Sequence, residues 1–190
     1  MGFFDPFRRT VLPPPVPGDG VTLRFPAMED FPAWAALREK SRAFLEPWEP
    51  LWPQDDLSAA AFRYRVRRYR ELMSDDLCYP YFIFDRADAL LGAATLSNVR
   101  RGVAQMATLG YWIGEPFARH GHMTRALNAL VPFAFAQLGL HRVEAACLPR
   151  NAASIALLQK TGFEREGYAR NYLKIAGQWE DHLLFARMQA

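Results

Sequence analysis

Hydrophobic and polar residues follow two different periods along the chain, and each change of period marks a new predicted element. Alternation over residues 21–25 predicts a first strand. A helix is predicted to begin near Asp30 and to end before Pro47, which disfavours a helical conformation at the preceding residue. Ser58 is predicted to cap a second helix that runs to about Met73. The apolar stripe of this second helix has helical spacing and consists of Phe62, Val66, Tyr69 and Met73.

The period then changes to that of strands. Segments 81–84 and 90–96 predict a hairpin, and segment 106–113 predicts a further strand. An amphipathic helix is expected over 122–138, and Pro132 inside it should kink the helix or remove one hydrogen bond. The remaining elements are expected to be a strand over 141–148, a short helix from Asn151 or Ala152 to about Lys160, and a closing pair of strands around Ala176 and Gly177.

This order of elements places antiparallel strands first and a βαβ-like crossover late. It predicts a mixed α/β (α+β) domain and argues against a doubly wound Rossmann sheet. A chain of 190 residues is long enough for one such domain with a sizeable core. Because segment 13–18 is rich in proline, it predicts a stiff and extended conformation. We therefore expect a proline-rich tail over 1–20 and a single domain over 21–190.

Composition excludes several classes of protein. A hydrophobic fraction of 51% and a charged fraction of 23% are typical of globular proteins, and a net charge of +3 permits an acidic partner without requiring one. Cys78 and Cys147 lack metal-ligand spacing and predict reduced thiols in a cytoplasmic protein. His120 and His122 have no third ligand nearby in the sequence, so no metal is expected. No apolar run is long enough for a membrane span, and the N-terminus lacks the features of a signal peptide.

Two segments carry candidate binding chemistry. The first, 119–124, opens the amphipathic helix, and a loop that leads into a helix N-terminus offers N–H groups and a positive dipole end to a pyrophosphate. Gly121 would let the backbone approach the phosphates without an intervening Cβ. The second segment, 151–154, opens the next helix. A glycine-containing turn before a core helix would give the first pattern too, so the loop alone leaves both interpretations open.

A series of spaced motifs resembles the GNAT superfamily of N-acetyltransferases. The superfamily's phosphate loop reads Gln/Arg-x-x-Gly-x-Gly/Ala, and segment 118–123 matches it strictly only at Gly121. The resemblance is closer to the bacterial ribosomal-protein-alanine N-acetyltransferases of the Rim type and covers about residues 20–190. Its supporting segments are 44–50, 97–102, 109–114, 141–145, 151–154, 163–169 and 177–182. The resemblance implies a mixed, mostly antiparallel central sheet that is splayed in the middle, with helices on both faces.

The resemblance also implies that acetyl-CoA binds where strands 106–113 and 141–148 splay apart. The pantetheine arm would pair with backbone near Tyr111, Trp112 and Ile113. Asn151 would contact the same arm, and Ser154 would lie near the sulfur. The pyrophosphate would be held by Arg119, His120, Gly121, His122, Met123 and Thr124.

The groups expected to catalyse acetyl transfer depart from the superfamily pattern. Many members place a Tyr general acid seven residues after the motif Asn, where this chain has Leu158, and some relatives carry a Glu base at the position of Leu173. Ser154 could donate a hydrogen bond to the leaving sulfur, or it could be an ordinary helix-start residue. Glu49, in a proline-rich loop with Trp48, is the candidate for binding or deprotonating the amine; a plain hydrogen-bond acceptor in that loop is the alternative.

The expected acceptor is the N-terminal α-amino group, of alanine, on a ribosomal or other protein. Such an amine has a pKa of about 7.7–8.0, against about 10.4 for lysine, so a strong base is optional. The alternatives are a small-molecule amine acetyltransferase and a CoA-binding module on the ribosome with little catalysis. The protein could be a monomer or a homodimer. The second helix carries Arg63, Arg65, Arg67, Arg68 and Arg70. These arginines would contact ribosomal RNA or an acidic protein, or they would form a solvated basic face.

Overall fold

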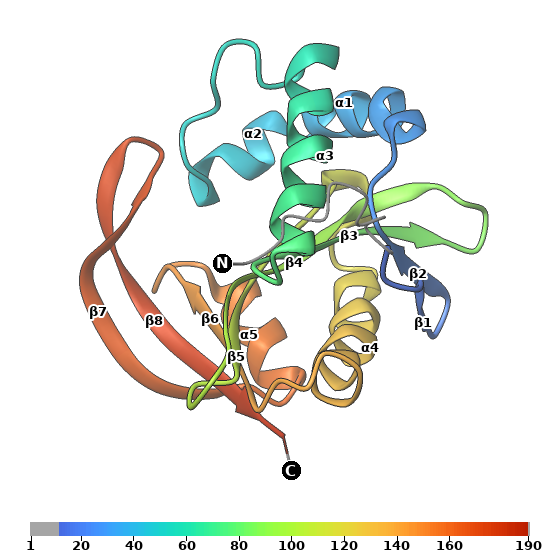
Figure 1. The fold of residues 1–190 in the computed structure, drawn as a ribbon. Helices are drawn as coiled ribbons and strands as arrows, with labels where there is room; N and C mark the ends of the chain where they lie inside the picture. Colours follow the sequence, from blue (N-terminus) through green and yellow to red (C-terminus); the bar gives the residue numbers. More distant parts are fainter. Residues whose placement is uncertain (1–11, 190) are drawn as a thin grey trace, which may run out of the picture.

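The computed structural model describes residues 12–189, whose strands form one eight-stranded sheet in the order β1-β2-β3-β4-β5-β6-β8-β7. Neighbouring strands are antiparallel except for β5 and β6, which are parallel. The strands are β1 (Val16–Gly18), β2 (Val21–Arg24), β3 (Tyr79–Asp85), β4 (Leu90–Arg100), β5 (Met106–Ile113), β6 (Arg142–Cys147), β7 (Glu164–Ile175) and β8 (Gln178–Met188). β7 and β8 form a long hairpin at one end of the sheet (Figure 1).

Helices cover both faces of this sheet. The α-helices are α1 (Phe31–Lys40), α2 (Arg42–Leu45), α3 (Ala59–Ser74), α4 (His122–Ala136) and α5 (Ala152–Lys160). Three short 3-10 helices are η1 (Met28–Asp30), η2 (Glu46–Trp48) and η3 (Glu115–Phe117). α1 and α3 lie on one face and α4 and α5 on the other (Figure 1). Side chains of α1 and α3 belong to one buried cluster, and side chains of α4 and α5 belong to a second and larger one. The predicted fold class, mixed and mostly antiparallel with helices on both faces, is confirmed.

Local signals placed most helix ends correctly. The Ser58 hydroxyl accepts a hydrogen bond from the N–H of Ala61 and caps α3, while the Asn151 side chain accepts one from the N–H of Ser154 and caps α5. Phe62, Val66 and Met73 of the predicted α3 stripe are buried. α4 runs as one helix through Pro132, and it ends at Ala136, two residues earlier than expected.

The structure differs from expectation at the start of the chain. Val16–Gly18 pairs with Val21–Leu23, and the Val16 side chain is buried, so the sheet begins inside the segment expected to be a tail. Pro17 is tolerated there because β1 is an edge strand, where a missing N–H donor breaks no ladder bond on the open side. Residues 1–11 of the expected tail lie outside the described residues.

The first predicted helix is also divided in two. α1 ends at Lys40, and α2 begins at Arg42. The buried Ser41 between them accepts a hydrogen bond at its hydroxyl from the N–H of Glu115. This contact reaches the segment after β5, and no local pattern could have announced it.

The sheet opens between β5 and β6. Their parallel pairing is limited to Met106 with Arg142, Ala107 with Val143 and Thr108 with Glu144. Beyond these pairs, β5 continues against β4 alone and β6 against β8 alone. The splay that the family resemblance implied is therefore confirmed, and it lies between the C-terminal halves of β5 and β6.

Candidate active site

The loop that leads into α4 adopts left-handed backbone conformations, and we call residues 119–124 the left-handed loop. Arg119 has a φ of +65°, and Gly121, which is the N-cap of α4, has a φ of +75°. A side chain at Gly121 would be strained by this φ, and its Cβ would come within 3.1 Å of Arg125 Nη1. Because glycine has no side chain to cap the helix, the first-turn N–H groups of α4 remain available to an anion. The geometry of this loop therefore suits an anion at the N-terminus of α4.

Histidine and arginine side chains gather around this terminus. Nη2 of Arg125 lies 2.9 Å from Nδ1 of His122, and the ring centroid of His120 lies 6.1 Å from that of His122. Burial lowers the pKa of His122, and the charges of Arg125 and His120 lower it further. His122 is therefore neutral at neutral pH and accepts a hydrogen bond from Arg125. Arg119 and His120 are exposed and Thr124 is half-buried, whereas the side chain of Met123 packs in the core and leaves only its backbone for binding.

Two hydroxyl groups meet at the open end of the splay. The Tyr111 hydroxyl, on β5, lies 2.6 Å from the Ser154 hydroxyl, in the first turn of α5. Burial raises the pKa of Tyr111, and it also raises that of the neighbouring Cys147 thiol at the end of β6. Both groups therefore stay protonated at neutral pH. The Tyr111 side chain is a feature that sequence reasoning missed, since only its backbone was expected to contribute.

The opposite face of β5 carries a cluster of charged and aromatic side chains. Both Glu49 oxygens accept hydrogen bonds from Arg38, at 2.8 and 2.7 Å, and Trp52 Nε1 donates a further one at 2.7 Å. The Arg38 guanidinium also stacks on the rings of Trp52 and Trp112, at 3.9 and 5.0 Å from their centroids. We call Arg38, Glu49 and Trp52 the loop clamp. Glu49 was a candidate from the sequence, whereas the only signal for Arg38 was its place among apolar residues of the first helix.

The loop clamp sits beside the β7–β8 turn. The carbonyl oxygen of Glu49 accepts a hydrogen bond from the N–H of Ala176, at 2.8 Å. Arg150, after β6, forms an ion pair with Glu180 of β8 and lies 5.9 Å from the ring centroid of Trp48. Three separate parts of the chain therefore meet around the expected acceptor loop. Leu158 is buried and Leu173 is exposed on β7, so neither position supplies an acid or a base.

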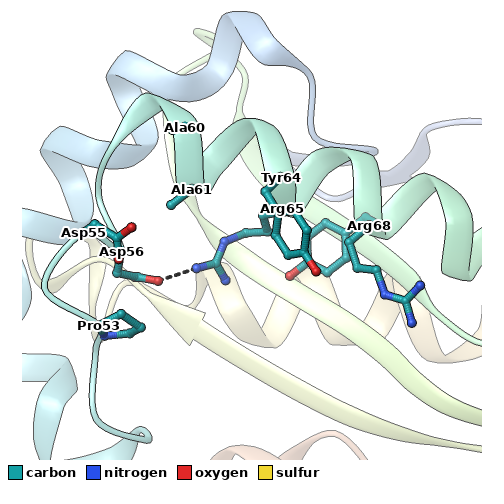
Figure 2. Close-up of a pocket in the computed structure, with 9 residues that line it drawn as sticks. Pro53, Asp55, Asp56, Ala60, Ala61, Tyr64, Arg65 and Arg68 are labelled. Atoms are coloured by element: carbon teal, nitrogen blue, oxygen red, sulfur yellow. Dashed lines mark hydrogen bonds and ion pairs between the residues drawn. The ribbon is translucent and has the colours of Figure 1, made fainter.

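A hollow of about 580 Å³ lies between this loop and α3. Figure 2 shows Arg65 reaching from α3 to Asp56 of the loop, an ion pair with an N–O distance of 2.6 Å. The hollow is lined by Pro53, Asp55, Asp56, Ala60, Ala61, Tyr64, Arg65, Arg68 and Tyr69. Tyr69 also lies beside Thr95 of β4.

Three further observations concern the described residues as a whole. Within 12–189 there is no group of three or more His, Cys, Asp and Glu side chains suited to a metal ion. In the same part of the chain no helix combines the length and apolarity required to cross a membrane. Cys78 and Cys147 are both buried and free.

A parallel strand pair that splays beside a glycine-capped helix N-terminus is the arrangement that the resemblance implied for an acetyltransferase. A model of the acetyltransferase (GNAT) domain matches residues 21–164, and the chain belongs to this family. The family uses acetyl-CoA.

Similar proteins place the chain more narrowly. It is 37% identical over 151 residues to YjcK of Bacillus subtilis, a probable N-acetyltransferase, covering 79% of this chain and 83% of that one. It is 35% identical over 162 residues to the ribosomal protein uS5-alanine N-acetyltransferase of Escherichia coli, covering 84% of each. The structure of Mycobacterium smegmatis RimJ, in complex with CoA-disulfide, has a TM-score of 0.86 at 31% identity, covering 92% of this chain and 86% of that one. The protein is an acetyl-CoA-dependent N-acetyltransferase of the RimJ/RimL kind.

Proposed function

We propose that this protein acetylates the N-terminal α-amino group of a protein, with an alanine-initiated ribosomal protein as acceptor. The relative from Escherichia coli is named for that acceptor class. The observation that carries the proposal is the engagement of Glu49, whose two carboxylate oxygens accept hydrogen bonds from Arg38 and Trp52. Both oxygens are already occupied as acceptors, and an α-amino group with a pKa of about 7.7–8.0 needs only a weak base.

In this proposal the contacts around Glu49 favour its role as a hydrogen-bond acceptor that holds the loop, over a role as the base. Ser154 is the proposed donor to the leaving sulfur, since Leu158 offers no acid. Tyr111, Trp112 and Ile113 would line the pantetheine arm together with Asn151. The left-handed loop at 119–124 would hold the pyrophosphate.

The decisive experiment offers two amines in one peptide. A synthetic peptide that begins with alanine and carries an internal lysine is incubated with enzyme and acetyl-CoA, and the acetylated position is read by tandem mass spectrometry. Acetylation of the α-amino group is expected, and the lysine should stay free because almost all of it is protonated near neutral pH. Transfer only to lysine or to small amines would overturn the proposal. CoA binding without turnover on any amine would indicate a binding module instead.

We propose further that the exposed face of α3 contacts the ribosome. Arg63, Arg67, Arg68 and Arg70 are exposed, whereas Arg65 is half-buried and bound to Asp56. Arg67 and Arg68 share Glu71 in exposed ion pairs that contribute little to stability, so these arginines can exchange partners at low cost. An arginine-rich face of this kind suits the phosphate backbone of RNA.

A further inference from the structure

The hydrogen bond between Tyr111 and Ser154 joins the two walls of the splay. Tyr111 lies on β5 beyond its last pair with β6, and Ser154 lies on α5, which follows β6. The oxygens are 2.6 Å apart although the residues are 43 positions apart in the chain. The bond therefore sets the relative position of two groups that the sheet itself no longer holds together.

The chemistry of the two hydroxyls decides the direction of this bond. A phenol is a stronger acid than an aliphatic alcohol and is the better donor. Burial keeps Tyr111 protonated, so its O–H is available to donate at neutral pH. The Ser154 oxygen then accepts from Tyr111, and its own hydrogen must point elsewhere. The neighbouring Cys147 thiol is within hydrogen-bond reach of Ser154, but burial keeps it protonated. A neutral thiol is a weak acceptor, so a sulfur that develops negative charge is the stronger acceptor for that hydrogen.

The backbone of Ser154 is fixed independently of its hydroxyl. Its N–H donates to the side-chain oxygen of Asn151 at 3.0 Å, which anchors the first turn of α5. Asn151 holds the backbone of Ser154, and Tyr111 occupies one lone pair of its hydroxyl oxygen. These two contacts restrict the directions in which the Ser154 O–H can point. A preorganised donor of this kind stabilises developing charge without reorganising during the reaction.

We propose that Tyr111 is a positioning residue, whose phenol turns the Ser154 hydrogen toward the leaving sulfur. This inference rests on the proposed role of Ser154. When bound, acetyl-CoA supplies the thioester acetyl group. As the amine nitrogen bonds to the carbonyl carbon, the C–S bond breaks, the sulfur leaves with the electron pair as thiolate, and the proton lost by the amine passes to water. The Ser154 O–H stabilises that charge by a hydrogen bond, while Tyr111 keeps its own proton.

The test combines Tyr111→Phe, Ser154→Ala and the double variant. One charge-assisted hydrogen bond corresponds to roughly a tenfold change in rate, so each single variant is expected to lower kcat about tenfold or more, with KM for acetyl-CoA changed less than about threefold. The double variant is expected to match Ser154→Ala, because Tyr111 acts only through the serine. Thermal melting of each variant verifies that it is folded.

A second measurement does not depend on turnover. The thiol of CoA bound to the enzyme is titrated by the ultraviolet absorbance of its thiolate. A hydrogen bond to the thiolate lowers the pKa of that thiol, and Tyr111→Phe is expected to raise it by about 1 relative to wild type. A purely structural role of the Tyr111 ring would leave this pKa unchanged, because phenylalanine keeps the ring.

Tyr81→Phe is the matched control. Tyr81 is a buried tyrosine on β3 whose hydroxyl has no hydrogen-bond partner among the described residues, so its loss should leave both kcat and the thiol pKa unchanged. If Ser154→Ala lowers kcat and Tyr111→Phe does not, the role of Tyr111 is wrong and the proposed role of Ser154 stands. If Ser154→Ala has no effect, both are wrong. A further loss from Tyr111→Phe in the Ser154→Ala background would also overturn the inference.

Discussion

Truncation of Glu49 distinguishes a general base from a structural anchor. The Arg38 side chain is 9% exposed and that of Glu49 is 20% exposed. Removing one partner of a buried pair costs about 3–5 kcal/mol, because the other charge stays buried without compensation. The residual exposure of Glu49 reduces this, and Glu49→Ala is expected to lower the free energy of unfolding by about 2–3 kcal/mol. In a domain of this size the Tm should fall by about 5–10 °C.

The kinetic effect should differ in kind from the loss of a base. The loop clamp holds the segment that contacts the β7–β8 turn through the carbonyl of Glu49. Loosening it is expected to raise KM for the acceptor peptide, while kcat at saturating peptide stays within about threefold of wild type. Loss of a general base would instead lower kcat by about 100-fold or more. Steady-state kinetics with an alanine-initiated peptide, together with thermal melting, measures both quantities.

Two variants complete this experiment. In Arg38→Met with Glu49→Leu both charges are replaced by apolar groups, and most of the lost stability should return, because no charge is left buried alone. Glu46→Ala is the matched control, since Glu46 belongs to the same loop and forms only an exposed ion pair with Arg42 at 3.6 Å. If Glu49→Ala and the paired variant both lower kcat 100-fold at unchanged Tm, Glu49 is a general base and not a structural anchor.

Three further predictions concern the phosphate loop and the basic helix. Gly121→Ala should weaken CoA binding about tenfold by calorimetry, because a left-handed φ costs a residue with a side chain about 1–2 kcal/mol. Gly139→Ala is the control: Gly139 has a φ of +62° and open space around it, so the variant carries the same strain and should leave CoA binding unchanged. The lowered pKa of His122 means that the folded state resists protonation, so the free energy of unfolding should fall as pH drops below the ordinary pKa of 6.5. In chemical denaturation, His122→Gln should lose less of this free energy between pH 7 and pH 5 than wild type does. An equal loss in both proteins would contradict the reasoning. Replacing Arg63, Arg67 and Arg70 by Glu should weaken ribosome binding and reduce its salt dependence in co-sedimentation, without changing acetylation of a free peptide. Unchanged ribosome binding would show that these arginines form only a solvated basic face.

Local chemistry explains which parts of the site were predictable. Ser58 and Asn151 cap their helices with their own side chains, and Gly121 takes the left-handed φ that glycine favours, so short segments announced these positions. The family motifs also lie in short segments. By contrast, nothing near Val16 indicated that it would be buried, because its pairing depends on where β2 lies in the sheet.

The sequence by itself determined most of the elements, the family and the cofactor, because these follow from residue types at short spacing. Only the tertiary structure decided where the sheet splays, since this depends on pairing that stops at Thr108 and Glu144. It also decided the partners of the chemically important side chains. Arg38 meets Glu49 across 11 positions and Tyr111 meets Ser154 across 43. Such contacts form because distant elements pack together, and the sequence near each residue does not show which distant residue it will meet.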